Sequence, residues 1–434
     1  MTTKILLINV HSFHNAGDHA LTQVAIQQLK SRFPDCQLTL IMDDPESFAG
    51  DEKVIGSFFT WLKTARKGQE PRWVLRNLLL LIPVSLVPIL TFWLTGKPLL
   101  LLSPSKVRNL LTAYLSSDLI ISAPGGFLYH SGKGITLLIS AYTIALGWLA
   151  GKPIYVLPQS IGPFIHKWEC QIIRWVLSPV RKIMVREEIS LRELMNCQIP
   201  LECCHLLPDL AFAFRGATEA SAVEWLENQG IDLDADRPIL GVTVINWGAQ
   251  NSSFNLQSQY ETALADASCY FLNNYGGRIV FIPQVWGPSP SNDDRIPTRR
   301  IIEMLPITFT NILYIDQPPA PNLLKAIYGQ LDFFIGTRMH SNIFALSQYV
   351  PTIAIGYQHK TLGITKMLGI DQWTIEIQQI SGQILKEKID DLFDSQETVR
   401  RHLIDTIPIL VQQSERAGEI IESDYSNLIK VPIA

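Results

Sequence analysis

A cation and an imidazole lie two residues apart where an apolar strand gives way to a helical run. Arg338 and His340 belong to the sequence Gly336-Thr337-Arg338-Met339-His340. Ligands of open α/β sheets collect at the carboxyl ends of strands, so this turn is well placed for an anionic substrate. An arginine can hold a carboxylate or phosphate through two parallel hydrogen bonds, and a histidine can transfer a proton. The alternative is a structural histidine that only caps its own helix.

Other strand ends carry small or polar residues that could also meet a ligand. These candidates are Asn15, Gly17 and Asp18 after the first strand, Gly125 and Gly126 after another, and Gln159, Ser160 and Gly162 after a third. The start of a helix can present backbone N–H groups to a phosphate, and glycine permits a positive φ. Each could equally be an ordinary turn, with Asp18 near a helix N-cap. Arg186 and Lys360 follow two further strands and would add cations at the same edges.

Composition narrows the class of protein. A chain of 434 residues exceeds the usual size of one hydrophobic core, so two domains are expected. A formal charge of -4 gives no basic footprint for nucleic acid. The six cysteines show neither a C-x-x-C pair nor a regular spacing, which predicts reduced thiols of a cytosolic protein and no zinc site. The apolar run 5–10 is too short for a secretory signal.

Short β-branched runs alternate with helical stretches, which is typical of parallel sheets built from βαβ units. We predict strands at 4–9, 37–42, 118–122, 153–157, 182–185 and 205–207, and a second series at 239–245, 278–282, 311–315, 333–335 and 352–355. The predicted fold class is α/β, with two Rossmann-like domains facing a cleft. The first domain is expected at 1–214, a linker at 215–238, and the second domain at 239–385. A helical segment at 386–434 should pack back across the first domain.

An apolar insertion interrupts the first domain at about residues 73–102. Residues 77–96 carry no charged side chain, and about 20 apolar residues are what one membrane-spanning helix needs. Pro83 and Pro88 should break such a helix, and a single crossing would put half of one sheet on each side of the membrane. A re-entrant hairpin, an interfacial helix, or a buried insertion in the core or an oligomer interface remain as alternatives. Basic residues on both flanks favour a cytoplasmic protein held peripherally on the inner face of a membrane.

Taken in order, the motifs resemble the polysaccharide pyruvyl transferase family over about residues 5–360. The set is Gly17-Asp18, Gly125-Gly126, Gln159-Ser160-Ile161-Gly162-Pro163, Val185-Arg186-Glu187-Glu188 with Ser190, Pro208-Asp209 with Ala211-Phe212, Gly336 with Arg338 and His340, and Tyr357 with Lys360. The resemblance implies a GT-B-like fold and phosphoenolpyruvate as the donor. The implied acceptor is a pair of sugar hydroxyls in a cell-surface polysaccharide or its lipid-linked precursor. It also implies that Arg186 and Arg338 handle the donor and that His340 is the general acid.

The implied reaction forms a pyruvate ketal and releases phosphate, and it requires no metal or other cofactor. A GT-B glycosyltransferase that uses a nucleotide sugar is one alternative, because a two-domain cleft with cations would serve a diphosphate equally well. A non-catalytic, membrane-associated scaffold of glycan assembly, anchored by residues 77–96, is another. A homo-oligomer is compatible with the sequence.

Overall fold

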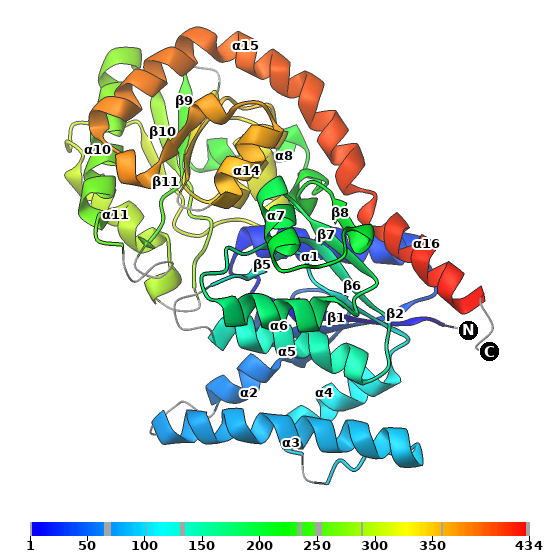
Figure 1. Ribbon diagram of the computed structural model, residues 1–434. Helices are drawn as coiled ribbons and strands as arrows, with labels where there is room; N and C mark the ends of the chain where they lie inside the picture. The colour runs from blue at the N-terminus through cyan, green and yellow to red at the C-terminus, as the bar shows by residue number, and fades with distance from the viewer. Residues whose placement is uncertain are drawn as a thin grey trace. The chain divides into compact units, whose positions relative to one another are not determined.

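The computed structural model describes residues 2–64, 71–101, 103–130, 135–231, 233, 237–247, 254–287, 290–356 and 359–430. Two compact units make up the chain. The first contains Met1–Phe13, Ala25–Leu207 and Glu415–Ala434, and the second contains His14–Val24 and Pro208–Ser414. Each unit is built around its own parallel sheet, and each is described by itself (Figure 1).

The sheet of the first unit has the strand order β3-β2-β1-β4-β6-β7-β8, with β5 paired to β6, and every pair is parallel. Its strands are β1 (Lys4–Val10), β2 (Gln37–Met42), β3 (Lys53–Gly56), β4 (Leu119–Ser122), β5 (Gly125–Leu128), β6 (Ile154–Ile161), β7 (Lys182–Val185) and β8 (Cys204–Leu206). All residues of β4 and β6 are buried. Continuous burial is expected of parallel strands that helices cover on both faces.

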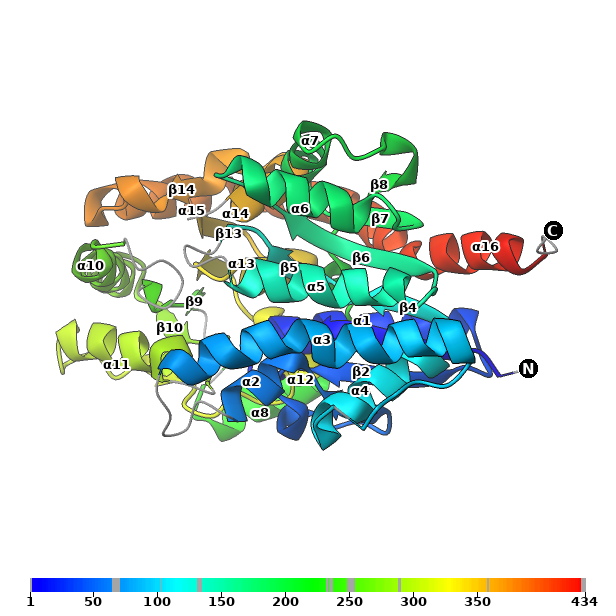
Figure 2. The same ribbon diagram turned by 60° about the horizontal axis from the view of Figure 1, so that its bottom comes forward.

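Helices on both faces provide that cover (Figures 1 and 2). The helices that cover the sheet are α1 (Ala16–Arg32), α2 (Phe58–Thr64), α4 (Ser105–Ser116), α5 (Ile135–Leu149), α6 (Lys167–Leu177), α7 (Glu188–Asn196) and α16 (Ala417–Lys430). A further helix, α3 (Pro71–Thr95), packs on α2 and α4. In α16, Asp424 accepts a hydrogen bond from Tyr155 of β6 (2.9 Å) and pairs with Arg181 (3.0 Å). The last helix therefore packs on the first unit.

The second unit repeats the same topology in its own sheet, with the order β11-β10-β9-β12-β13-β14, again all parallel. The strands are β9 (Ile239–Val242), β10 (Arg278–Phe281), β11 (Ile312–Tyr314), β12 (Phe333–Gly336), β13 (Thr352–Gly356) and β14 (Thr374–Glu376). The helices are α8 (Glu219–Asn228), α10 (Gln257–Tyr275), α11 (Arg295–Met304), α12 (Pro321–Tyr328), α13 (Met339–Ser347), α14 (His359–Met367) and α15 (Gly382–Ser414). The strand order reverses beside β1 and beside β9, which is where doubly wound sheets bind ligands.

The prediction of an α/β fold with two parallel sheets is confirmed, and every predicted strand is present. The limits differ most for β6, which runs on to Ile161 so that Gln159 and Ser160 lie inside the strand and not after it, and for β9, which ends at Val242. Three strands were missed. Two of them, β3 and β14, are very short, and β5 begins with the Gly125-Gly126 pair that we interpreted as a turn. Gly125 has a φ of 146°, so its backbone does adopt a conformation that favours glycine.

The compact units divide the chain at points other than the predicted domain limits. The loop after β1 and the start of α1 belong to the second unit, and α15 and α16 belong to different units. Within the predicted linker 215–238, α8 packs against α12, while residues 232 and 234–236 lie outside the described part of the chain.

The apolar insertion forms one continuous helix, so the prediction that Pro83 and Pro88 break it is wrong. Pro88 has no N–H to donate to the Val84 carbonyl one turn earlier. Ser103 Oγ donates to that carbonyl instead, at 2.9 Å. The freed acceptor is therefore satisfied from outside the helix, which removes part of the cost of the proline. Within the described ranges, no helix has the length and apolar character that a membrane crossing needs.

One pair of cysteines corrects the prediction of six reduced thiols. Cys170 in α6 and Cys197 at the end of α7 form a disulfide, with their Cα atoms 4.9 Å apart. The proximity arises because α6 and α7 follow neighbouring strands β6 and β7, and sequence spacing does not reveal it.

Candidate active site

The turn that carries Arg338 and His340 is fixed by buried hydroxyl groups. Thr337 N donates to Thr243 Oγ1 at 3.1 Å, and Thr337 Oγ1 donates to the Thr243 carbonyl at 3.1 Å. Tyr260 OH lies 2.8 Å from Thr337 Oγ1, and Ser341 Oγ donates to the Arg338 carbonyl at 2.6 Å. Because β12 lies beside β9, the turn occupies the switch point of the second sheet.

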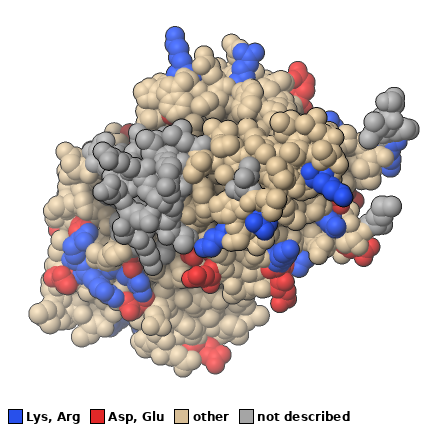
Figure 3. Space-filling view, turned by 90° about the horizontal axis from the view of Figure 1, so that it is seen from below, with Lys and Arg blue, Asp and Glu red and all other residues tan. Residues whose placement is uncertain are grey.

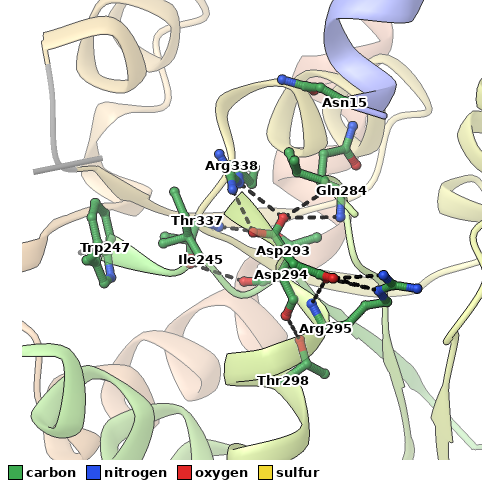
Figure 4. Close-up of polar contacts among 12 residues, drawn as sticks. Asn15, Ile245, Trp247, Gln284, Asp293, Asp294, Arg295, Thr298, Thr337 and Arg338 are labelled. Atoms are coloured by element: carbon green, nitrogen blue, oxygen red, sulfur yellow. Dashed lines mark hydrogen bonds and ion pairs between the residues drawn. The ribbon is translucent and has the colours of Figure 1, made fainter. Parts of the chain in front are cut away.

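Arg338 is oriented by a buried carboxylate (Figure 4). Its Nη2 lies 2.6 Å from Asp294 Oδ1, and its Nε donates to Asp294 Oδ2 at 3.1 Å. Backbone N–H groups of Gln284 and Val285 also donate to Asp294. Burial raises the pKa of Asp294, and the Arg338 guanidinium opposes that rise. The pair uses two of the five guanidinium N–H donors and fixes the plane of the group.

His340 lies at the second position of α13, between an acid and a glycine. Its Nε2 is 3.8 Å from Oδ2 of Asp209, which is buried and whose Oδ1 accepts from Ala211 N at 2.8 Å. A Cβ atom added at Gly17 would lie 2.1 Å from His340 Nδ1. The imidazole therefore packs directly against the backbone of the first turn of α1.

The loop after β1 is attached to the same part of the second unit. Asn15 Oδ1 accepts from Gly17 N at 3.0 Å, and Asn15 Nδ2 donates to Asp18 Oδ2 at 2.8 Å. Ala16 N donates to the Gln284 carbonyl at 3.1 Å. Asn15 thus occupies the position before α1 and Asp18 its first turn. The structure brings the predicted residues Asn15, Gly17, Asp18, Arg338 and His340 together.

A buried lysine holds the segment that carries Asp209. Lys325 of α12 is 3% exposed, and its Nζ donates to the carbonyls of Phe214 (2.6 Å) and Ala211 (3.4 Å). Burial lowers the pKa of Lys325 to about 7. The lysine therefore ties α12 to the turn that follows Asp209.

Stability should depend on pH through Lys325. Between pH 7 and 10.5 the unfolded chain keeps the Lys325 proton that the folded chain has released, so the free energy of unfolding rises with pH. One such proton contributes at most about 1.4 kcal/mol per pH unit. Lys325→Met should lose this rise, whereas Lys366→Met, at an exposed position of α14, should retain it. Urea unfolding of the wild type and both variants between pH 7 and 10.5 measures the free energy of unfolding. If that free energy depended on pH in the same way in all three proteins, the prediction would be wrong.

The first unit carries a second group of predicted residues at the ends of β1, β4 and β6. Gln159 Nε2 donates to Ser122 Oγ (3.1 Å) and to the Ala123 carbonyl (2.7 Å), and Asn9 Nδ2 donates to Ser122 Oγ (3.2 Å). Gly125 of β5 is the register partner of Gln159 and is followed by Gly126. These residues meet at the switch point of the first sheet.

Arg186 belongs to a buried network beside them. Its Nε donates to Ser160 Oγ at 2.7 Å and lies 3.6 Å from Glu187 Oε2. Ser160 Oγ donates to the same carboxylate oxygen at 3.0 Å, and Ser190 Oγ binds the other one. Arg186 is only 2% exposed, and Ser160 Oγ links its guanidinium to the buried Glu187 carboxylate. Gly162 follows β6 with a φ of 80°.

Lys360 lies in the first turn of α14, directly after β13. Tyr357 of the same motif lies outside the described residues. Two acids were not predicted as site residues. Asp209 stood in a motif to which we assigned no role, and Asp294 was missed, although Asp293-Asp294-Arg295 is a conspicuous run of charge before α11.

A cavity of about 600 Å³ occupies a different place in the first unit. It lies between β1, β2, β3, α2 and α4, and its lining includes Lys4, Lys53 and Lys106. None of the predicted site residues lines this cavity. We therefore do not assign the active site to it on the basis of its volume.

The topology of the two parallel sheets is that of a GT-B-like fold. The chain is similar over its whole length to solved structures of that fold. A UDP-GlcNAc 2-epimerase from Neisseria meningitidis bound to UDP-GlcNAc has a TM-score of 0.57 at 11% identity, covering 99% of this chain and all of that one. Sucrose-phosphate synthase from Thermosynechococcus elongatus has a TM-score of 0.57 at 13% identity, covering 99% of each chain.

The particular family follows from the sequence. The family model for polysaccharide pyruvyl transferase matches residues 15–359, so the chain belongs to this family. The amylovoran biosynthesis protein AmsJ of Erwinia amylovora is 24% identical over 97% of this chain and 98% of its own length. The chain is therefore a transferase of polysaccharide biosynthesis.

Proposed function

We propose that the enzyme transfers the pyruvyl group of phosphoenolpyruvate to two hydroxyls of one sugar, which forms a pyruvate ketal and releases inorganic phosphate. The observation that carries the proposal is the arrangement of His340, with Asp209 at 3.8 Å and Arg338 two residues away at the switch point. The imidazolium would donate a proton to the methylene carbon of phosphoenolpyruvate.

Protonation converts the methylene into the methyl group and leaves positive charge at the neighbouring carbon. One sugar hydroxyl attacks that carbon, and the second displaces phosphate. The proton of the first hydroxyl returns to His340, and the proton of the second hydroxyl leaves on hydrogen phosphate. Atoms and charges therefore balance. Arg338 and Arg186 are the proposed ligands of the donor carboxylate and phosphate, because guanidinium groups bind both in a planar, bidentate manner.

Asn15, Gly17, Asp18, Gly125, Gly126, Gln159, Ser160, Gly162 and Lys360 are proposed to bind substrates. We infer a cell-surface polysaccharide or its lipid-linked precursor as the acceptor. AmsJ, a protein of amylovoran biosynthesis, supports a polysaccharide product. A lipid-linked acceptor would place the reaction on the inner face of a membrane.

The identity of the released group tests the proposal. Purified enzyme should release inorganic phosphate from phosphoenolpyruvate only when an acceptor sugar is present, and the product should gain the mass of a pyruvate ketal. Release of a nucleotide from a nucleotide sugar would instead establish a glycosyltransferase. If neither phosphate nor a nucleotide were released with any lipid-linked or nucleotide-linked acceptor, a non-catalytic scaffold of glycan assembly would be favoured.

Donor binding should depend on Arg338. Arg338→Lys should weaken phosphoenolpyruvate binding by roughly tenfold or more, because an ammonium cannot make a planar bidentate contact. Lysine is preferred to alanine, since alanine would leave Asp294 buried without its cation, at a cost of about 3–5 kcal/mol. Titration calorimetry measures the affinity.

Arg295→Lys is the matched control, because Arg295 pairs with Asp293 in the same neighbourhood. Arg186→Lys should behave like Arg338→Lys. Unchanged affinity in both the Arg186 and the Arg338 variants would move the donor site elsewhere.

A further inference from the structure

The outward side of α3 is apolar and open to solvent. Leu90 and Leu94 are 59% and 74% exposed, and Leu101, after the helix, is 82% exposed. The opposite side, with Leu81, Ser85 and Ile89, is buried. We use the name α3 face for the exposed side chains of Leu80, Ile82, Leu90, Trp93, Leu94 and Leu101. Contiguous apolar surfaces of this kind mark interaction sites.

The α3 face has a rigid base. Trp93 Nε1 donates to the Leu149 carbonyl at the end of α5 (3.0 Å), and Ser85 Oγ binds Tyr142 OH of α5. Figure 1 shows α3 at the edge of the first unit, with α2 and α4 packed against it. Ile135 and Leu138, each 42% exposed, extend the apolar surface on α5 itself. Because contacts with α5 hold α3 in place, the α3 face needs no refolding to meet a partner.

The sequence segment that carries the α3 face has charges of one sign. Residues 71–117 contain five basic residues, Arg72, Arg76, Lys97, Lys106 and Arg108, and no Asp or Glu, in a chain whose formal charge is -4. In Figure 3, which looks at the molecule from below, a broad area without charged residues fills much of the described surface, and both basic and acidic residues lie near its edges. An apolar surface on a segment whose only charged residues are basic is complementary to a bilayer that contains anionic lipid.

We propose that the α3 face docks this enzyme on an anionic lipid bilayer, with α3 lying in the plane of the interface. A second copy of the chain fits less well, since a twofold interface would bring the same basic residues of both copies together with no acid of this segment between them. The buried side of α3 remains packed on the protein, so docking requires no crossing. The inference goes beyond the proposed reaction and depends on neither donor nor acceptor.

Vesicle sedimentation of the full-length chain tests the proposal. The wild-type chain should bind vesicles of phosphatidylcholine with phosphatidylglycerol more tightly than phosphatidylcholine alone, and salt should weaken that preference. Leu90→Ser with Leu94→Ser should reduce binding roughly tenfold or more. Ile404→Ser with Ile409→Ser, at positions of α15 that are 49% and 54% exposed, is the matched control and should bind like wild type. Lys97→Gln should reduce binding to anionic vesicles about fivefold.

Wild-type chain that ignores both kinds of vesicle would overturn the proposal, whatever the variants do. If that chain is also a dimer that Leu90→Ser with Leu94→Ser makes monomeric, the α3 face is an interface between two copies. Phosphate release with a water-soluble acceptor, measured on the same preparations, keeps the two proposals separate. Loss of vesicle binding with phosphate release intact would reject only the docking proposal. Vesicle binding without phosphate release would reject only the proposed reaction.

Discussion

His340→Gln should lower turnover by roughly 100-fold or more while the protein stays folded, which is the scale of a lost general acid. A glutamine side chain has polar atoms near those of the imidazole but cannot donate a proton to carbon at neutral pH. Because the lost interaction belongs to the transition state, the effect should fall on kcat more than on KM. Steady-state phosphate release with a defined acceptor measures it.

His402→Gln provides the comparison for His340. His402 is also in the second unit, where its Nε2 hydrogen-bonds the Leu368 carbonyl from α15. We expect the His402→Gln variant to lose activity only in proportion to any loss of folded protein, which thermal unfolding measures. Near-normal turnover of a folded His340→Gln enzyme would remove His340 from the mechanism.

Gly17→Ala should nearly abolish activity although it adds only one methyl group. The new Cβ would lie 2.1 Å from His340 Nδ1 and 2.6 Å from His340 Cβ. Since His340 Cβ is fixed to the backbone, rotation of the ring cannot relieve the overlap, and α1 or α13 must shift. Overpacking of this kind costs about 1–3 kcal/mol of stability. A displacement near 1 Å at a catalytic group can cost about 100-fold in rate.

Turnover and thermal unfolding of Gly17→Ala measure both effects, and Gly356→Ala is the control. At Gly356 an added Cβ would make contacts of 3.4 Å or longer, which are ordinary. A double-mutant cycle adds a direct test, because the stability cost of Gly17→Ala should shrink in a His340→Gly background. An unchanged cost in that background, or full activity of Gly17→Ala, would show that the close packing is not required.

The order of the elements could be predicted from the sequence because the signals are local. Buried parallel strands are continuous apolar runs, and those at 118–122 and 153–157 were found for that reason. The motif order also led to the family. Short or glycine-rich strands such as β3 and β5 carry too little local signal, and their pairing with β2 and β6 decides their conformation.

Contacts between distant parts of the chain decided the rest. Only folding shows that Asp209 faces His340, that Asp294 pairs with Arg338, and that Gly17 must lack a side chain because an imidazole lies against it. The continuity of α3 through Pro88 likewise depends on Ser103, which replaces the missing backbone donor. The sequence by itself determined which residue types are present and which elements carry them. The tertiary structure decided which acid accompanies each cation, because that pairing depends on distances in space that sequence spacing does not encode.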